Sequence, residues 1–226
     1  MPEPVKPRRA YDSTRRREAA EQTRERILAA ARARFLADGY AGTTIAAIAS
    51  DAGTAAETVY ANFRTKPALL EAVVRAAARG EGATEIPDQP GPLAAAAADD
   101  PREQLRRFAA DVVLRLERVG PLLRVLGAAE AAEPALAEMH ERVQSTRREN
   151  LRAVPAALDR VGALAVPEEA AADTVWALAS PDVHDLLTRR RGWSRERYAD
   201  WLATTLAAAL LRPDAPPPRR SSRARR

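Results

Sequence analysis

The sequence predicts an all-α protein of about nine or ten helices, in which a small helix-turn-helix head precedes a larger helical bundle. Aromatic residues make up 4% of the 226 residues, alanine is abundant, and no alternating run of Val, Ile and Thr indicates a strand. The stretch from Thr43 to Leu70 contains two short segments of helical periodicity joined by a glycine. Such a pair of helices can place its second member in the major groove of DNA.

Charge changes sign along the chain. The first 80 residues carry 14 Lys and Arg against 9 Asp and Glu, residues 81–211 carry 16 against 21, and residues 212–226 carry 6 against 1. Coding bias can account for the richness in Arg, but it explains the changes of sign less readily. A basic N-terminal part on an acidic body is typical of a DNA-binding head attached to a body with another task.

Composition excludes several classes of protein. The 226 residues give room for one or two helical units with their own core, and the absence of cysteine excludes a disulfide framework, a thiolate metal site and a Cys nucleophile. No run approaches the ~18 apolar residues of a membrane span, and the first residues contain no apolar signal core. We therefore expect a soluble, cytoplasmic protein without membrane attachment.

The N-terminal residues predict an arm followed by a helix. Residues 1–17 combine Pro with Arg and show no apolar period, so we expect a disordered basic arm that either reaches a minor groove or contacts nothing specific. From residue 18 to 37 the apolar residues recur at helical spacing, with Ile27 and Phe35 on one face. We expect this first helix to end at Gly39.

Two short helices complete the predicted head, which spans residues 18–65. The first begins after Thr44 and is closed by Gly53, where the chain reversal needs a positive φ angle. Thr54 and Glu57, three residues apart, match the pattern of a capping box. The second helix is therefore expected to start at Thr54.

The second short helix carries Val59 and Phe63 four residues apart, a spacing that predicts core packing. Along this part of the chain an aromatic residue and G-Y precede the patterns T-T-I-x-x-I-A, A-G and T-V-Y-x-x-F-x-x-K-x-x-L-L. The whole run, from Ile27 to Leu70, resembles the N-terminal domain of the TetR family of transcriptional repressors. The resemblance implies a TetR-like fold with a C-terminal domain for ligand binding and dimerisation.

The resemblance also implies which residues contact DNA. Thr44 would offer its hydroxyl and backbone N–H to a phosphate, Tyr60 its hydroxyl and Lys66 its ammonium. The second helix opens with two alanines where the family usually has small polar or basic residues, although alanine can touch a thymine methyl. Thr58 ranks above Glu57 as a base reader, because the capping box would occupy the glutamate. The implied set is Thr43, Thr44, Thr54, Ala55, Ala56, Glu57, Thr58, Tyr60, Ala61 and Lys66.

Residues 66–211 are expected to form a linking helix and a helical body, followed by a disordered basic tail over residues 212–226. The linking helix starts near Pro67 and ends at Gly80. After it we expect a mobile loop, with room for a short helix in its alanine run, and then a series of body helices that includes a kink or break at Pro155. The loop is residues 81–100, and the helices are 101–120, 121–132, 134–164, 167–179, one starting at 181, and 194–211.

A ligand site in the body is implied by the resemblance, because members of this family bind inducers among their body helices. The corresponding segments supply candidate lining residues, each of which can equally belong to the hydrophobic core. They contain no strong polar anchor, so we expect an apolar or weakly polar ligand, or none. The candidates are Phe108, Val112, Leu126, Met139, Trp176 and His184.

The last predicted helix has a broad apolar stripe and small residues that would let another helix approach closely. Two C-terminal helices from each of two subunits could pack as a four-helix interface, as the resemblance also implies. We therefore expect a homodimer whose interface includes Tyr198, Trp201, Leu202, Thr205, Leu206 and Ala209.

Signs of catalysis are few. The two histidines, His140 and His184, lie far apart, and the sequence has no metal-ligand spacing, Gly-rich phosphate loop or nucleophile elbow. We expect no enzyme activity, no cofactor and no metal ion. The residues and the resemblance together predict a repressor that a small-molecule inducer releases from a palindromic double-stranded DNA operator. The alternatives are a ligand-independent DNA-binding dimer, and a helical small-molecule binding protein or enzyme that retains the helix-turn-helix as structure.

Overall fold

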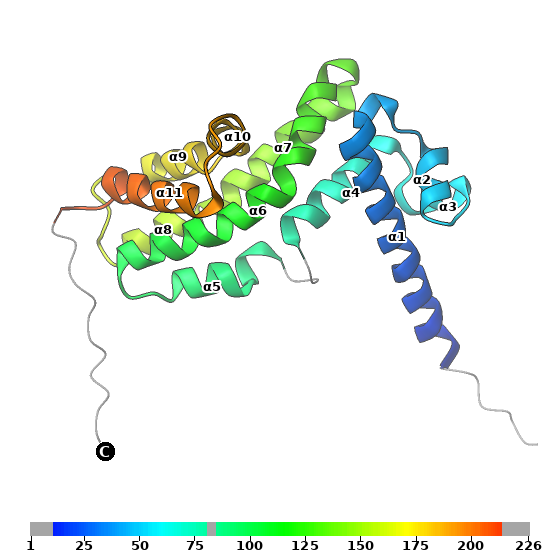
Figure 1. Ribbon diagram of the computed structural model, residues 1–226. Coiled ribbons are helices and arrows are strands. Elements are labelled where there is room, and N and C mark those ends of the chain that lie inside the picture. The colour runs from blue at the N-terminus through cyan, green and yellow to red at the C-terminus, as the bar shows by residue number, and fades with distance from the viewer. Residues whose placement is uncertain (1–10, 81–84, 214–226) are drawn as a thin grey trace, which may run out of the picture. The chain divides into compact units, whose positions relative to one another are not determined.

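All regular structure in the described residues is helical, apart from one antiparallel bridge between Leu164 and Leu211. The computed structural model describes residues 11–80 and 85–213. The chain divides into two compact units, Met1–Val73 and Val74–Arg226, which we call the N-terminal unit and the C-terminal unit. The predicted all-α class is confirmed (Figure 1). Within the described part, every helix is too short or too polar to cross a membrane.

The N-terminal unit contains one long helix and two short ones. These are α1 (Tyr11–Gly42), α2 (Ile45–Asp51) and α3 (Ala56–Phe63), and α4 (Lys66–Arg79) then carries the chain into the C-terminal unit (Figure 1). Gly39 leaves the helical geometry of α1 with a φ angle of 69°, at the place where the first helix was predicted to end.

The first helix begins earlier than the sequence predicted. Residues 11–17 are the first turns of α1 and not a disordered arm, because after Pro7 the sequence is rich in Arg, Ala and Glu, which favour a helix. Residues 1–10 of that arm lie outside the described part of the chain. The N-terminal unit extends to Val73 and so includes the first half of α4, whereas the head of residues 18–65 stays a prediction.

Apolar side chains from α1, α2 and α3 form the interior of the N-terminal unit. Ile27 and Phe35 of α1, Ile48 of α2, and Val59 and Phe63 of α3 all have 5% or less of their surface exposed. Ile27, Phe35, Val59 and Phe63 were predicted to face inward from their helical spacing. Burying such side chains contributes about 1.5 to 3 kcal/mol each, which is how three helices of this size hold together.

The C-terminal unit is built from the second half of α4 and the remaining helices. The long helix α6 runs through it. The shorter helices α5, α7, α8, α10 and α11 each contact α6. The elements are η1 (Ile86–Asp88), α5 (Pro90–Ala96), α6 (Pro101–Ala129), η2 (Glu130–Ala132), α7 (Pro134–Leu151), α8 (Ala153–Arg160), α9 (Glu168–Leu178), α10 (Pro181–Asp185), η3 (Leu186–Arg190) and α11 (Arg195–Leu210).

Prolines interrupt the helices of this unit at one position and not at another. The predicted break near Pro155 is confirmed, since α7 ends at Leu151 and the proline lies in the first turn of α8. The predicted division at residue 120 is wrong, because α6 continues through Pro121. Buried residues on both sides of this proline, Val119 and Leu122 among them, hold the helix together although the ring removes one backbone hydrogen bond. The predicted loop before α6 contains α5, which begins earlier than its alanine run.

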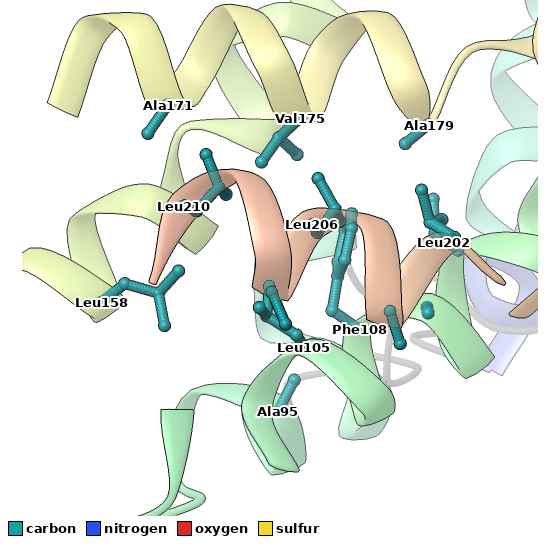
Figure 2. Packing of buried hydrophobic residues seen from close by; sticks show 14 of the residues in the cluster. Ala95, Leu105, Phe108, Leu158, Ala171, Val175, Ala179, Leu202, Leu206 and Leu210 are labelled. Carbon is teal, nitrogen blue, oxygen red and sulfur yellow. The ribbon is translucent and has the colours of Figure 1, made fainter. Parts of the chain in front are cut away.

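The helix α11 lies at the centre of the C-terminal unit. Figure 2 shows Leu202, Leu206 and Leu210 between α9 on one side and Leu105 and Phe108 of α6 on the other. The three leucines have no exposed surface. The last helix is therefore covered by α6 on one side and by α9 on the other.

This position corrects half of the predicted dimer interface. Tyr198, Leu202 and Leu206 are fully buried inside their own chain, so their side chains have no surface left for a second subunit. The prediction was wrong for them because an apolar stripe shows that a face is covered but not by which chain. Trp201 and Thr205 are half-buried and Ala209 is exposed, and for these residues the interface stays a prediction.

Candidate nucleic-acid interface

The turn between α2 and α3 is built by backbone hydrogen bonds at the end of α2. The amide of Gly53 donates to the carbonyl of Ser50 at 3.2 Å, and the amide of Thr54 donates to the carbonyl of Ala49 at 3.0 Å. This pair of bonds is the Schellman motif, which requires the left-handed conformation that Gly53 adopts with a φ angle of 62°. The predicted role of this glycine in the helix-turn-helix is confirmed.

The same motif overturns the predicted capping box. Because the amide of Thr54 is used to close α2, this residue belongs to the turn, and α3 starts only at Ala56 with Ala55 as its N-cap. No side chain accepts a hydrogen bond from the first amides of α3. The Glu57 side chain therefore does not cap the helix, and it is exposed in the first turn of α3.

Two neighbouring threonines before α2 have different tasks. The hydroxyl of Thr44 accepts a hydrogen bond from the amide of Ala47 at 3.1 Å, which confirms Thr44 as the N-cap of α2. Thr43 is 1% exposed, and its hydroxyl donates to the carbonyl of Gly39 at 2.7 Å. The predicted DNA contact of the Thr43 side chain is therefore wrong, because this group is buried and holds the end of α1.

The helix α3 has a buried side and an exposed side. Val59 and Phe63 face the core, whereas Glu57, Tyr60 and Ala61 are exposed. The Tyr60 side chain is 51% exposed, so its hydroxyl is accessible to a partner. Of the other residues in the predicted DNA-contacting set, Ala55 is exposed, and Thr54, Ala56 and Thr58 are half-buried.

Basic residues follow α3 directly. Lys66, predicted to meet a phosphate, begins α4, and its ammonium lies 4.2 Å from the centroid of the Tyr40 ring. Tyr40 is itself buried and stacked on Phe35, so this cation–π contact ties the charge to the core without neutralising it. Arg64, which the sequence analysis did not select, is exposed and has a positive φ angle of 61°. Its place immediately after α3 is the signal that could have identified it.

A bidentate ion pair fixes α2 against α1. The Nε and Nη2 atoms of Arg34 lie 2.6 Å and 3.0 Å from the two carboxylate oxygens of Asp51, and Nη1 lies 3.4 Å from Asp38. The hydrogen bonds from Arg34 lower the pKa of the Asp51 carboxyl. The pair is exposed to solvent, so its main effect is on the orientation of α2 and less on stability.

The candidate ligand residues of the C-terminal unit are all at least half-buried. Four of them lie in its interior and have 8% or less of their surface exposed, namely Phe108, Val112, Leu126 and Met139. Such burial is expected of core residues and of pocket residues alike, so it does not separate the two roles. Trp176 is half-buried on α9. The described part of the chain places no group of three or more His, Asp and Glu residues where they could hold a metal ion.

Two of these candidates have buried polar atoms without a hydrogen-bond partner among the described residues, namely Nε1 of Trp176 and Nε2 of His184. The His184 ring meets the edge of Tyr198 at a centroid distance of 4.9 Å, and burial lowers the pKa of His184. The Tyr198 hydroxyl donates to the carbonyl of Leu178 at 3.2 Å, at the end of α9. Nε of Arg79 and Oε1 of Gln104 are likewise unpaired among the described residues, so the unit carries the cost of an unpaired buried polar atom at four positions.

Arg147 completes the polar surroundings of Trp176. Its guanidinium lies 4.9 Å from the centroid of the Trp176 ring, and both Nη atoms donate to the carbonyl of Trp176 at 2.9 Å. Burial lowers the pKa of Arg147 to about 10, so the group remains charged at neutral pH. This arginine therefore caps the C-terminal end of α9, where a positive charge is favourable.

Comparison with known proteins agrees with this geometry. The family model for bacterial regulatory proteins of the tetR family matches residues 27–73. No curated protein matches the chain. Among solved structures, a putative TetR-family transcriptional regulator from Mesorhizobium loti is 21% identical, with a TM-score of 0.67 and with 85% of this chain and 98% of that chain covered.

Two further solved structures are similar over nearly their whole length. NalD, the secondary repressor of the MexAB-OprM multidrug efflux pump in Pseudomonas aeruginosa, is 24% identical with a TM-score of 0.64, and 87% of this chain and 99% of that chain are covered. The SmeT–triclosan complex is 22% identical with a TM-score of 0.67, and 87% of this chain and 95% of that chain are covered. At these identities the likeness shows a shared fold.

The structural role of Thr43 can be tested directly. Replacing Thr43 with Val removes the buried hydroxyl and leaves the half-buried Gly39 carbonyl without its donor, so the free energy of unfolding should fall by about 1 to 3 kcal/mol. Denaturant titration followed by circular dichroism measures this loss, and Thr43→Ser should restore most of it. A Thr43→Val variant that unfolds like the wild type but binds DNA more weakly would instead make Thr43 a DNA contact.

Proposed function

Because the chain is a member of the TetR family of bacterial transcriptional regulators, we propose that it acts as a homodimeric repressor on a roughly palindromic operator. In this proposal each subunit inserts one α3 helix into the major groove. A small molecule bound in the C-terminal unit releases the DNA. The alternative function is that of a dimer that binds DNA without responding to a ligand.

The exposed face of α3, bordered by a capped helix and a basic residue, is the observation that carries the proposal. The N-cap Thr44 and the ammonium of Lys66 stand before and after the helix-turn-helix, where phosphates on either side of a major groove could be met. Between them Tyr60 offers an accessible hydroxyl. The rigid core of Val59 and Phe63 would hold these groups at a fixed spacing.

Base reading would rest on few polar groups. Ala55 and Ala56 can contact thymine methyl groups, and Glu57, which is not occupied by capping, can accept a hydrogen bond from the amino group of cytosine. We therefore rank Glu57 above the half-buried Thr58 as a base reader, the reverse of the order expected from the sequence. With so few donors, the shape of the DNA would supply part of the specificity.

A route from ligand to DNA runs through α6. The guanidinium of Arg115 donates to the carbonyl of Ala78 at 2.7 Å, and that of Arg118 donates to the carbonyl of Ala77 at 3.2 Å. These carbonyls close the last turn of α4, the helix that continues into the N-terminal unit. The helix α6 also carries Phe108, one of the candidate ligand residues. A ligand that displaces α6 would therefore shift the end of α4. In the dimer this shift would favour a spacing of the two N-terminal units that no longer fits the operator.

The ligand would pair the nitrogens of Trp176 and His184, which are two of the four unpaired buried polar atoms among the described residues. The Trp176 indole N–H can only donate, and the neutral His184 imidazole leaves one ring nitrogen to be paired. A mostly apolar molecule with one acceptor and a second polar group would pair both nitrogens and lie against the apolar side chains. SmeT, which shares the fold, was solved as a triclosan complex, so triclosan is a reasonable first probe.

The phosphate role of Lys66 gives the first test. Lys66→Ala should weaken binding to operator and to unrelated duplex alike, and should reduce the slope of log affinity against log salt by about one counterion per subunit. Fluorescence anisotropy with labelled duplexes over a salt series measures both quantities. Arg160→Ala, which removes an exposed cation from the C-terminal unit, is the control and should leave the slope unchanged. An unchanged slope for Lys66→Ala would remove this residue from the interface.

The ligand site gives the second test. Compounds are screened, beginning with triclosan, and those that raise the unfolding temperature of the protein and weaken its binding to the operator are kept. For such a compound, Trp176→Phe keeps the ring but removes the N–H, and should raise the concentration for half release about fivefold, as the loss of one neutral hydrogen bond does. Operator affinity without the compound should not change. If the compound releases the wild type, Trp176→Phe and His184→Phe at the same concentration, the ligand binds elsewhere. If no compound that binds the protein weakens its complex with DNA, the ligand-independent dimer is favoured.

A further inference from the structure

The link between α3 and α4 is only two residues long. The helix α3 ends at Phe63 and α4 begins at Lys66, so Arg64 and Thr65 make the whole connection. The amide of Thr65 donates to the carbonyl of Phe63 at 2.6 Å, and Arg64 between them has a φ angle of 61° and a ψ angle of −50°. This is the geometry of a γ-turn with positive φ, which is the rare and strained form of that turn.

Arg64 is the only residue other than glycine with a positive φ angle in the described part of the chain. Glycines adopt this conformation without strain, because they have no Cβ atom. In a residue with a side chain, a sparsely populated backbone conformation shifts an equilibrium by about one order of magnitude. Such a conformation persists only where the surrounding structure enforces it.

The residues on both sides of Arg64 are committed to helices. Its own amide donates to the carbonyl of Tyr60 at 2.8 Å and completes the last turn of α3. On the other side Thr65 is the N-cap of α4, because its hydroxyl accepts from the amide of Ala68 at 3.2 Å and its carbonyl accepts from the amide of Leu69 at 3.0 Å. The change of direction between the helices therefore falls on Arg64 alone.

The core holds the two helices in the positions that require this turn. Phe63 at the end of α3 is 5% exposed, and the guanidinium carbon of Arg24 lies 4.5 Å from the centroid of its ring. Leu69 and Leu70, near the start of α4, have no exposed surface. The Arg64 side chain is exposed and forms no hydrogen bond or ion pair with the described residues. Its strain is thus held by the packing of the two helices and not by contacts of its own.

We propose that the Arg64 turn is a strained joint, which couples the position of α3 to that of α4 and favours release of DNA when α4 is displaced. When α4 moves relative to α3, Arg64 returns to a negative φ angle, and the relief of strain lowers the cost of the movement. Because the joint is so short, α3 cannot keep its place in the major groove once α4 has moved. The helix α4 also continues into the C-terminal unit, so the joint lies on the route by which a ligand would act. This role rests on the proposed function.

Two variants, Arg64→Gly and Arg64→Gln, isolate the backbone of this joint. Both lose the guanidinium, so a comparison between them cancels any effect of the charge on DNA binding. Glycine adopts a positive φ angle without strain, whereas glutamine keeps the Cβ atom that makes the conformation costly. Arg160→Gly, at an exposed arginine in the last turn of α8, is the control for the other effects of glycine.

The strain itself is measured without DNA or ligand. Arg64→Gly should unfold about 2 to 4 °C above Arg64→Gln, because the folded state of the glycine variant carries no strain at this turn. Hydrogen exchange of the α3 amides should be about fivefold slower in Arg64→Gly, since local opening no longer relieves strain. Arg160→Gly should instead lower the unfolding temperature of the wild type, because glycine is unfavourable in a helix.

The role in release is measured on the complex with operator DNA. Triclosan, or another compound from the screen that releases the wild type, is the probe. Arg64→Gly should need about fivefold more of this compound for half release than Arg64→Gln, because the displaced position of α4 no longer gains from relief of strain.

Each outcome decides one question. Equal unfolding temperatures and equal exchange rates in Arg64→Gly and Arg64→Gln would overturn the strained joint, whatever the protein does with DNA. A more stable Arg64→Gly that releases DNA at the same compound concentration as Arg64→Gln would overturn the role in release and leave the proposed function standing. If no compound releases the wild type, the ligand response and the role of the joint in it are both overturned, and the exchange rates still decide whether the turn is strained.

Discussion

Burial of Val59 and Phe63 is the constraint on which the N-terminal unit depends. The helix α3 has only eight residues and would not persist alone in water, since isolated helices of this length do not repay the cost of their first turn. Its two inward side chains pack into the core formed with α1 and α2, and this decides which residues are left outside. The exposed surface of Glu57, Tyr60 and Ala61 is thus a consequence of the core.

The core of the C-terminal unit includes the leucines of α11, but it leaves polar atoms unpaired. These leucines are covered by α6 and α9, so that a movement of either helix changes the packing of α11. Against this apolar background the buried nitrogens of Trp176 and His184 lack partners. Such positions are candidates for ligand contacts because a ligand that pairs them removes a cost that the unliganded unit carries.

The elements that could be predicted from the sequence are those set by local geometry. Thr44 caps α2 because its side chain reaches an amide three residues on, and Gly53 closes α2 because a left-handed residue is needed there. The inward position of Val59 and Phe63 follows from a spacing of four residues in a helix. These features together identified the helix-turn-helix and its family.

The errors arose where two interactions compete for the same group or where packing decides. The Thr54 amide is used by the turn after α2, which excludes the capping box that its sequence pattern suggests. Packing on both sides carries α6 through Pro121, against the local preference of proline. An apolar stripe cannot tell which chain covers it, so Tyr198 was assigned to a subunit interface although it lies in the core.

In the proposed repressor, two α3 helices of a symmetric dimer read one DNA site. Selection of bound duplexes from a random pool by the full-length chain, followed by sequencing, tests this arrangement. The enriched sequence should have twofold symmetry, with half-site centres separated by about 10 base pairs or a multiple of that spacing. An enriched sequence without symmetry, or no enrichment over the starting pool, would contradict it.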